Sequence, residues 1–547
     1  MSTAAARAYG GDTRRRRARA ADPVPPRMRR RILLLALPAA LAACRTGDSA
    51  PERHSLIDSR DRNDPRSLDP ALSTDVPTGR AVGYVFEGLT RFSPDATLEP
   101  ALATRWDVAP DGRSYTFHLR SGVTFQDGSP VTAARVVASF GRVLAPGSAG
   151  GRQWPLLPIA GAKEFAAGSA KAISGLRVVD DSTVQITLTE PLAAFPKLLA
   201  MPVAAIVPAK TGADFGQHPV GTGPWTFVEW KHDDYLKFAA NPKYWGGRPK
   251  VDTLIARIIP EPSTAVAEFE SGNVDVLDVP EQETRQWQET DEKKARLQSA
   301  PSLRLWYVGI NTTRGPLADV RVRQAINYAI DSKAILERLV GNRGRLAAGV
   351  IPPTLEGADT LRAPYPHDVA KAKALLAAAG HPSGIDVELW VGQDATFVRV
   401  AQTIQSYLAE AGIRAKLVQR DSPSVREAAR SGSTDLVLKD WFADYPDAES
   451  FLYPLLHSAN SGVGGNVSFY KSATYDSLVT AGRREQDATR RAALYRAADS
   501  TAHADAPMVT LFFYKELYAV QPWVNGFQVP TVFNGQRWTA VGVTGAK

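Results

Sequence analysis

The chain has 547 residues, 44% of them hydrophobic and 22% charged, which is typical of a soluble globular protein too long for one compact core. Its formal net charge of +8 comes from the N-terminus, because residues 1–43 hold ten of the 65 Lys and Arg residues but two of the 57 Asp and Glu residues. The remainder is neutral, which argues against a basic groove for nucleic acid.

The first predicted segment is an export signal. An apolar run from Ile32 to Ala43 is too short to span a bilayer but fits the core of a signal peptide, and three arginines precede it. The run ends in Leu-Ala-Ala-Cys44, which resembles the lipobox of bacterial lipoproteins, where the cysteine is acylated. Cys44 is the only cysteine, so a disulfide within one chain is excluded.

We therefore expect an exported protein on a lipid anchor, periplasmic or at the outer face of the cell membrane. Residues 1–43 are predicted to be an N-terminal extension and a lipoprotein signal peptide, and Met1 and Met28 both remain open as the start. Residues 44–66 are polar and are predicted to form a tether.

The first half of the folded body carries two predicted hairpins. Apolar residues alternate with polar ones over residues 113–126 and again over 175–189, each with a turn in the middle. A helix is predicted between them, over residues 132–144.

The second half alternates helices and strands. The clearest helix is predicted over residues 317–340, because its apolar residues share one face and Gly341 follows. The next predicted elements are helix 368–379, strand 386–391, helix 395–411, strand 413–418, helix 423–430 and strand 434–441. This repeated order predicts a mostly parallel sheet with crossover helices.

The last of these strands ends in an aromatic segment, Trp441-Phe442-Ala443-Asp444-Tyr445-Pro446. Ligands of open α/β sheets lie beyond the carboxyl ends of strands. Aromatic rings beside one carboxylate suit a cationic, partly apolar ligand. A surface turn is the alternative interpretation, because Asp and Pro are common turn residues.

Several segments, taken in order, resemble the family 5 solute-binding proteins of ABC transporters, the dipeptide, oligopeptide and nickel-binding group. The segments are Asp69-Pro70, Tyr84–Leu89, Leu102–Gly128, Gly221–Trp225, Asn241–Gly247, Gly309–Asn311, Val322–Asn327 and Trp441–Pro446. The resemblance implies an α/β class II periplasmic-binding-protein fold, with two lobes, a hinge and an extra α+β subdomain.

The resemblance also implies the domain boundaries. Lobe I would comprise residues 67–82, 215–306 and 517–547, the extra subdomain residues 83–214, and lobe II residues 307–516. The chain would cross the hinge near Leu305–Val308 and near Tyr514–Tyr518, and both predicted hairpins would fall in the extra subdomain. A ligand would be held between lobes that close by hinge motion.

Peptide-binding members capture the ligand's ammonium with an Asp in a W-x-x-D segment, and that Asp matches Asp444. Trp441, Phe442 and Tyr445 would either shape the pocket wall or pack between strand and helix, and Ala443 would offer backbone groups. Thr74 is the predicted counterpart across the cleft. Asp440 and Asp447 are alternatives that we expect to be solvated.

One departure concerns the ligand's carboxylate. Dipeptide-specific members place an Arg shortly after the strand that matches 386–391, whereas this chain has Gly392-Gln393-Asp394 there. Longer peptides, amino-sugar conjugates and other amines therefore remain open as ligands.

The predicted function is that of a monomeric, membrane-anchored binding protein that passes peptides or peptide-like molecules to the permease and ATPase subunits of an ABC importer. The alternatives are a tethered hydrolase and a ligand-sensing receptor. Neither G-x-S-x-G nor H-E-x-x-H nor a Walker motif occurs, and the eight histidines lack ligand spacing, so no enzyme activity, cofactor or metal is predicted.

Overall fold

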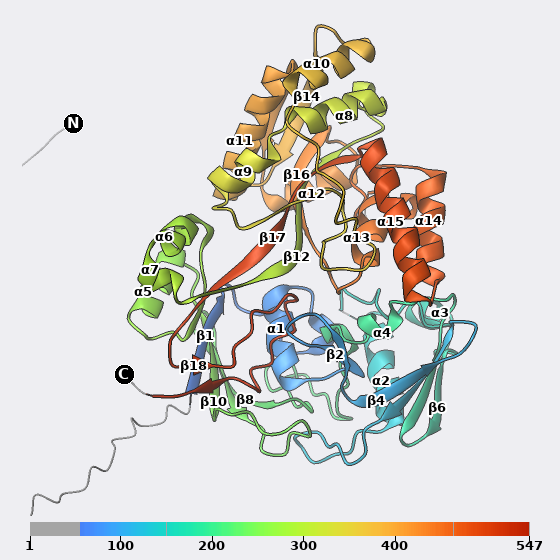
Figure 1. The fold of residues 1–547 in the computed structure, drawn as a ribbon. Helices are drawn as coiled ribbons and strands as arrows, with labels where there is room; N and C mark the ends of the chain where they lie inside the picture. Colours follow the sequence, from blue (N-terminus) through green and yellow to red (C-terminus); the bar gives the residue numbers. More distant parts are fainter. Residues whose placement is uncertain (1–54, 149, 463, 546–547) are drawn as a thin grey trace, which may run out of the picture. The chain divides into compact units, whose positions relative to one another are not determined.

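A mixed β-sheet runs through the part of the chain that the computed structural model describes, which is residues 55–148, 150–462 and 464–545 (Figure 1). Its strands, in spatial order, are β15 (Ile413–Gln419), β14 (Ile385–Val391), β16 (Leu436–Phe442), β12 (Leu297–Ile310), β17 (Met508–Val520), β11 (Val276–Asp278), β1 (Ser55–Asp61), β10 (Thr253–Ile258), β9 (Tyr235–Ala240) and β8 (Trp225–Lys231). β13 (Gly344–Leu346) pairs with β17.

The sheet is less parallel than predicted. β14 is parallel to both β15 and β16, and β1 is parallel to both β10 and β11. The central pairs are antiparallel, because β12 runs against both β16 and β17. The prediction of a parallel sheet from the strand–helix repeat is therefore correct for β14, β15 and β16, and it does not describe the centre of the sheet.

β12 and β17 are the longest strands described and lie side by side (Figure 1). They pair from Leu297 opposite Ala519 to Gly309 opposite Met508, with register shifts on the way. β12 also pairs with β16, and β17 also pairs with β11, so these two strands connect the two ends of the sheet. Both predicted hinge crossings lie within them.

The predicted tether is shorter than expected. Residues 55–61 form β1, whose Leu56 is fully buried, although the sequence analysis assigned them to a polar linker. Asp58 and Arg60 on this strand are also buried, and they neutralise each other at 2.9 Å. Residues 1–54, including Cys44 and the predicted signal peptide, lie outside the described residues.

A separate four-stranded antiparallel sheet has the order β4 (Ala103–Val108), β5 (Ser114–Leu119), β7 (Thr183–Thr187) and β6 (Leu176–Asp180). The hairpin predicted over 175–189 is confirmed as β6–β7. The hairpin predicted over 113–126 is wrong, because β5 pairs with β4 and β7 rather than with residues 123–126. Two short pairs complete the strands: β2 (Thr90–Phe92) with β3 (Leu98–Pro100), and β18 (Val524–Asn525) with β19 (Gly542–Val543).

The helix predicted over 317–340 is broken into α8 (Val320–Ala329) and α9 (Ser332–Leu339). Ile330 has extended backbone angles, and the Asp331 carboxylate accepts a hydrogen bond from the Ala334 amide, 2.9 Å away, which caps α9. The apolar spacing continues across this break, so periodicity alone predicted a single helix.

Most of the other predicted helices and strands are confirmed. α2 (Ala133–Leu144), α10 (Val369–Ala378), α11 (Ala395–Glu410) and α12 (Ser422–Arg430) agree with prediction to within a residue at either end, and β14, β15 and β16 to within two. The remaining helices are α1 (Val76–Val85), α3 (Ala162–Ala166), α4 (Phe195–Leu198), α5 (Pro262–Glu270), α6 (Thr284–Glu289), α7 (Asp291–Lys294), α13 (Glu449–Leu456), α14 (Ala473–Arg484) and α15 (Ala488–Asp505).

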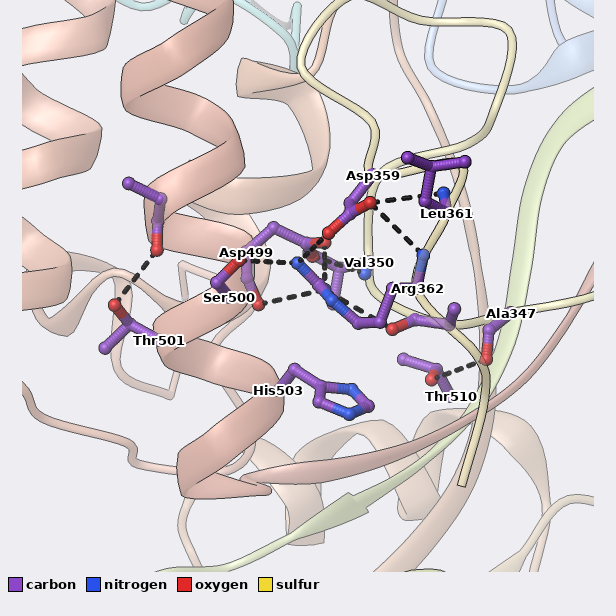
Figure 2. A network of polar contacts seen from close by, with 12 residues as sticks. Ala347, Val350, Asp359, Leu361, Arg362, Asp499, Ser500, Thr501, His503 and Thr510 are labelled. Carbon is purple, nitrogen blue, oxygen red and sulfur yellow. Dashed lines mark hydrogen bonds and ion pairs between the residues drawn. The ribbon is translucent and has the colours of Figure 1, made fainter. Parts of the chain in front are cut away.

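A buried polar network fixes the loop after β13 onto α15 (Figure 2). The Asp499 carboxylate, on α15, accepts hydrogen bonds from the Val350 amide at 2.7 Å and from Arg362 at 2.6 Å. Arg362 also contacts Asp359 at 3.3 Å. Asp499 is almost fully buried, so its partners supply the polar contacts that water would otherwise make. Nearby, burial lowers the pKa of His503 to about 4.

The largest apolar cluster contains residues of the four-stranded sheet and residues of the C-terminal helices α13, α14 and α15, which we call the helical region. It contains Phe117 of β5 and Phe140 of α2 together with Phe451 of α13 and Tyr475 of α14, all fully buried. Among the described residues, no helix has both the length and the apolar character needed to cross a membrane.

Candidate functional site

The predicted binding segment begins where β16 ends. The Ala443 amide donates to the Leu303 carbonyl at 2.9 Å, which extends the pairing of β16 with β12 by one residue. The Asp444 amide then donates to the Ser450 hydroxyl at 3.2 Å, near the start of α13. These two bonds fix the backbone on both sides of the Asp444 side chain. The N–H of Ala443 is therefore used within the protein, and the expectation that Ala443 offers backbone groups to a ligand stays a prediction for its carbonyl.

The Asp444 carboxylate faces a cation from another part of the chain. Arg152, in the loop between α2 and α3, places Nη1 3.2 Å from Asp444 Oδ1. About a quarter of each side chain is exposed, 28% for Arg152 and 25% for Asp444. Burial raises the pKa of the Asp444 carboxyl above its ordinary value, and the charge of Arg152 offsets only part of that effect.

Arg152 also contacts the segment that contains Thr74. Its Nη2 donates to the Thr74 carbonyl at 3.2 Å. Thr74 lies between the short 3-10 turn Pro70–Leu72 and α1, whose N-terminus is capped by Asp75. The structure thus brings the Thr74 carbonyl and the Asp444 carboxylate to the same guanidinium, and the placement of the two residues across a cleft stays a prediction. Arg152 itself was missed by sequence reasoning, because it lies in a loop without apolar periodicity, 292 residues from Asp444.

The aromatic residues of the segment differ in their surroundings. Tyr445 is buried, and its ring lies 6.1 Å from the ring of Trp154, which is 38% exposed. Trp441 is partly buried and donates its indole N–H to the Ser450 carbonyl at 2.8 Å. Phe442 is partly buried. Packing is therefore the main role of Tyr445, whereas Trp441 and Phe442 retain exposed surface.

The two neighbouring acids are both paired. Asp440 contacts Arg304 at 2.7 Å, with 37% of its side chain exposed. Asp447 is buried, contrary to the expectation that it would be solvated, and contacts Lys197 at 2.7 Å and Arg491 at 2.5 Å. Burial disfavours the charge of Asp447, but the two cations together hold its pKa well below the usual range.

Two cavities lie away from this segment. One, of about 20 Å³, is water-sized and is lined by residues that include Asp499, His503 and Met508. The other, of about 250 Å³, is lined by residues that include Arg314, Leu317, Asp386 and Asp435. Among the described residues, no group of three or more His, Cys, Asp or Glu side chains could hold a metal ion.

Comparison with known proteins gives a consistent set of relatives. Heme-binding protein A of Haemophilus influenzae is 30% identical over 94% of this chain and 99% of its own length. The dipeptide-binding protein of Escherichia coli is 30% identical over 85% and 90%. The unliganded open form of MppA, a periplasmic murein tripeptide-binding protein, has a TM-score of 0.79 at 25% identity, covering 90% of this chain and 98% of MppA.

The family model described as bacterial extracellular solute-binding proteins, family 5 Middle, matches residues 97–463. This match spans more than half of the chain, and the structural neighbours are periplasmic binding proteins with the same mixed α/β content. The two-lobed class II fold with an extra subdomain is therefore confirmed, and the chain belongs to the family 5 extracellular solute-binding proteins.

Proposed function

We propose that this protein captures peptides or peptide-like amines between its two lobes and passes them to the permease and ATPase subunits of an ABC importer. It acts by binding, without chemical change to the ligand. Relatives named for dipeptide and murein tripeptide binding support the ligand class. The lobe boundaries of this proposal are those implied by the family resemblance, with residues 83–214 as the extra subdomain.

The observation that carries this proposal is the position of the Asp444 carboxylate. It follows directly after a strand of the main sheet, is three-quarters buried, and shares Arg152 with the backbone of Thr74. A ligand ammonium that reached this carboxylate would form a charge-assisted hydrogen bond in a place with little water. Trp441 and Phe442 would supply apolar contact beside it.

The membrane part of the proposal concerns residues that the structure does not describe. We place the lipid anchor on Cys44 and the folded body in the periplasm or at the outer face of the cell membrane. Two or more acyl chains would give a stable anchor, since each buried CH₂ contributes about 0.8 kcal/mol.

The Asp444→Asn variant tests the ammonium site. The substitution keeps the shape of the side chain but removes its charge. We expect the affinity for trialanine, measured by isothermal titration calorimetry, to fall by several hundredfold, because breaking one partner of a buried pair costs about 3–5 kcal/mol. The affinity for N-acetyl-trialanine, which has no ammonium, should change little.

Asp386→Asn is the matched control, because Asp386 forms an exposed ion pair with Arg414 on β14 and β15. Both peptides should bind this variant as they bind the wild type. Equal losses for trialanine and N-acetyl-trialanine in Asp444→Asn would reject the ammonium role.

A further inference from the structure

The two long strands β12 and β17 have two register shifts, and the larger one lies opposite Tyr514. β12 pairs with β17 from Leu297 to Pro301 and again from Leu305, which faces Phe513. Three residues of β12 therefore stand opposite the single residue Tyr514. Such a bulge interrupts the backbone hydrogen bonds and bends the strand. The pairing of the two strands is therefore weakest at this point, which adjoins both predicted hinge crossings.

The bulge separates two halves of the main sheet. On one side, β13 pairs with residues 512–514 of β17, and β16 pairs with β12 from Arg304 onward. On the other side, β11 pairs with residues 518–520 of β17. Side chains that connect the β13 half of the sheet with the β11 half must therefore span the point where the strands bend.

Arg343 makes such a connection. It directly precedes β13, and only 3% of its side chain is exposed. Its Nη1 donates to the carbonyl of Val279, the residue after β11, at 2.6 Å, and its Nη2 lies 3.6 Å from Asp278 Oδ1. The turn before Arg343 packs tightly, because Gly341 has a φ of +63° and a Cβ atom there would lie 2.9 Å from Thr284 on α6. Arg343 thus joins the two halves through a charge that is nearly buried.

Tyr514 makes a second connection, at the bulge itself. Its hydroxyl donates to Glu281, in the 3-10 turn Glu281–Glu283 that follows β11, at 2.9 Å. Burial raises the pKa of Tyr514 well above its ordinary value of 10, so the hydroxyl keeps the proton that it donates. The guanidinium groups of Arg304 and Arg343 lie over the ring, 5.0 and 4.9 Å from its centre, which is the range of cation–π contacts. Side-chain contacts thus connect the strands where backbone pairing is interrupted.

These contacts favour the arrangement of the two halves in which they form. A rotation about the bulge would separate Arg343 from the Val279 carbonyl, and a nearly buried guanidinium that loses its acceptor is costly. In the same arrangement Arg152 contacts both Asp444 and Thr74. The contacts at the bulge therefore stabilise the state in which the proposed site is assembled, although they do not belong to that site.

We propose that Arg343 and Tyr514 form a hinge clamp that sets how tightly the protein binds its ligand without contacting the ligand. This proposal rests on the proposed function and adds a control of its closing step. The apparent affinity of a ligand falls with the fraction of molecules in which the site is assembled. A weaker hinge clamp lowers that fraction. It should therefore weaken the binding of every ligand that both lobes hold, whatever end groups the ligand carries.

Two variants weaken the hinge clamp to different degrees. Arg343→Met removes the guanidinium, whereas Tyr514→Phe removes only the hydroxyl and keeps the ring between its neighbours. In Arg343→Met we expect the affinities for trialanine and for N-acetyl-trialanine, measured by isothermal titration calorimetry, to fall by the same factor. That factor should be about tenfold or more, as for the loss of a hydrogen bond to a charged group. Tyr514→Phe should lower both affinities by a common but smaller factor.

Small-angle scattering without ligand gives a second measurement. Both variants should have a larger radius of gyration than the wild type, because fewer molecules are in the assembled arrangement. Arg414→Met, at the exposed ion pair with Asp386, is the matched control and should change neither the affinities nor the radius of gyration. Thermal unfolding shows whether each variant is folded, and Tyr514→Phe carries the test if Arg343→Met does not fold.

An unchanged radius of gyration, or unchanged affinities, in the folded variants would overturn the hinge clamp. A loss of affinity confined to trialanine would overturn it as well, because a change at the hinge does not depend on the ammonium of the ligand. If the wild type bound neither peptide, the proposed function would be rejected instead. Scattering of the ligand-free variants would then still decide whether the hinge clamp exists.

Discussion

Asp447 lies three residues beyond Asp444 and retains its charge although only 1% of its side chain is exposed. Lys197, at α4, and Arg491, on α15, supply the compensating charges. Arg491 is itself only 10% exposed, so it depends on Asp447 as much as Asp447 depends on it. A buried charge left without its partner is strongly destabilising.

We therefore expect Asp447→Asn to lower the free energy of unfolding by about 3–5 kcal/mol at pH 7, measured by urea denaturation. Asp386→Asn, at an exposed pair, should leave the stability nearly unchanged. If the two variants were equally stable, the ion pairs of Asp447 would contribute nothing net.

The ion pairs of Asp447 with Lys197 and Arg491 also predict that the stability of the protein depends on pH. The folded-state pKa of Asp447 lies well below its ordinary value of 3.8, so its stabilisation is present in full above that value. As the pH falls below 3.8 toward the folded-state pKa, the stabilisation is progressively lost. The difference in stability between the wild type and Asp447→Asn should shrink over this acid range, which urea titrations at several pH values would measure.

At the scale of elements, Asp331 is the N-cap residue of α9 and fixes the start of that helix. Its carboxylate satisfies the Ala334 amide at the first turn, and the helix that follows has only eight residues. We expect Asp331→Ala to cost about 1 kcal/mol in the free energy of unfolding, the usual effect of losing an N-cap. Asp331→Asn keeps a capping oxygen and should cost much less. Equal losses in the two variants would mean that the charge of Asp331, rather than its cap, matters.

Elements with regular apolar spacing could be predicted from the sequence. α11 and β14 form where the pattern placed them, because one face of each is buried in the same apolar cluster. β1 was missed because Asp58 and Arg60 make it look like a linker. Their charges cancel only when the strand is folded into the sheet, which no local pattern reveals.

The candidate site was predictable to the same extent. Asp444 follows a strand that periodicity could find, and the resemblance suggested the ligand-binding role that we propose for it. Arg152 has no such signal, because its contact with Asp444 depends on how the loop after α2 packs against a segment far along the chain. Ion pairs between distant loops arise from tertiary structure, and a single sequence does not contain their geometry.

At the scale of the whole folded body, the extra subdomain proposed for residues 83–214 is joined to the helical region at several points. The Ala193 amide donates to the Arg483 carbonyl at 3.0 Å, and Glu190 pairs with Arg484 at 2.7 Å. Lys197 reaches both Asp447 and the Pro446 carbonyl. These contacts lie next to the segment that carries Asp444, so motion of that segment relative to Arg152 would change them as well.

Hinge closure over a ligand gives the last prediction. In the proposed function one ligand contacts both Asp444 and the Thr74 region, so we expect ligand binding to favour a closed arrangement over more open ones. We expect trialanine at 100 times its dissociation constant to reduce the radius of gyration in small-angle scattering. The same concentration should raise the free energy of unfolding by about 2.7 kcal/mol. Asp444→Asn at the same peptide concentration is the control and should show neither change. An unchanged radius of gyration at a saturation confirmed by calorimetry would mean that the lobes do not swing, and that β12 and β17 act as a rigid connection rather than a hinge.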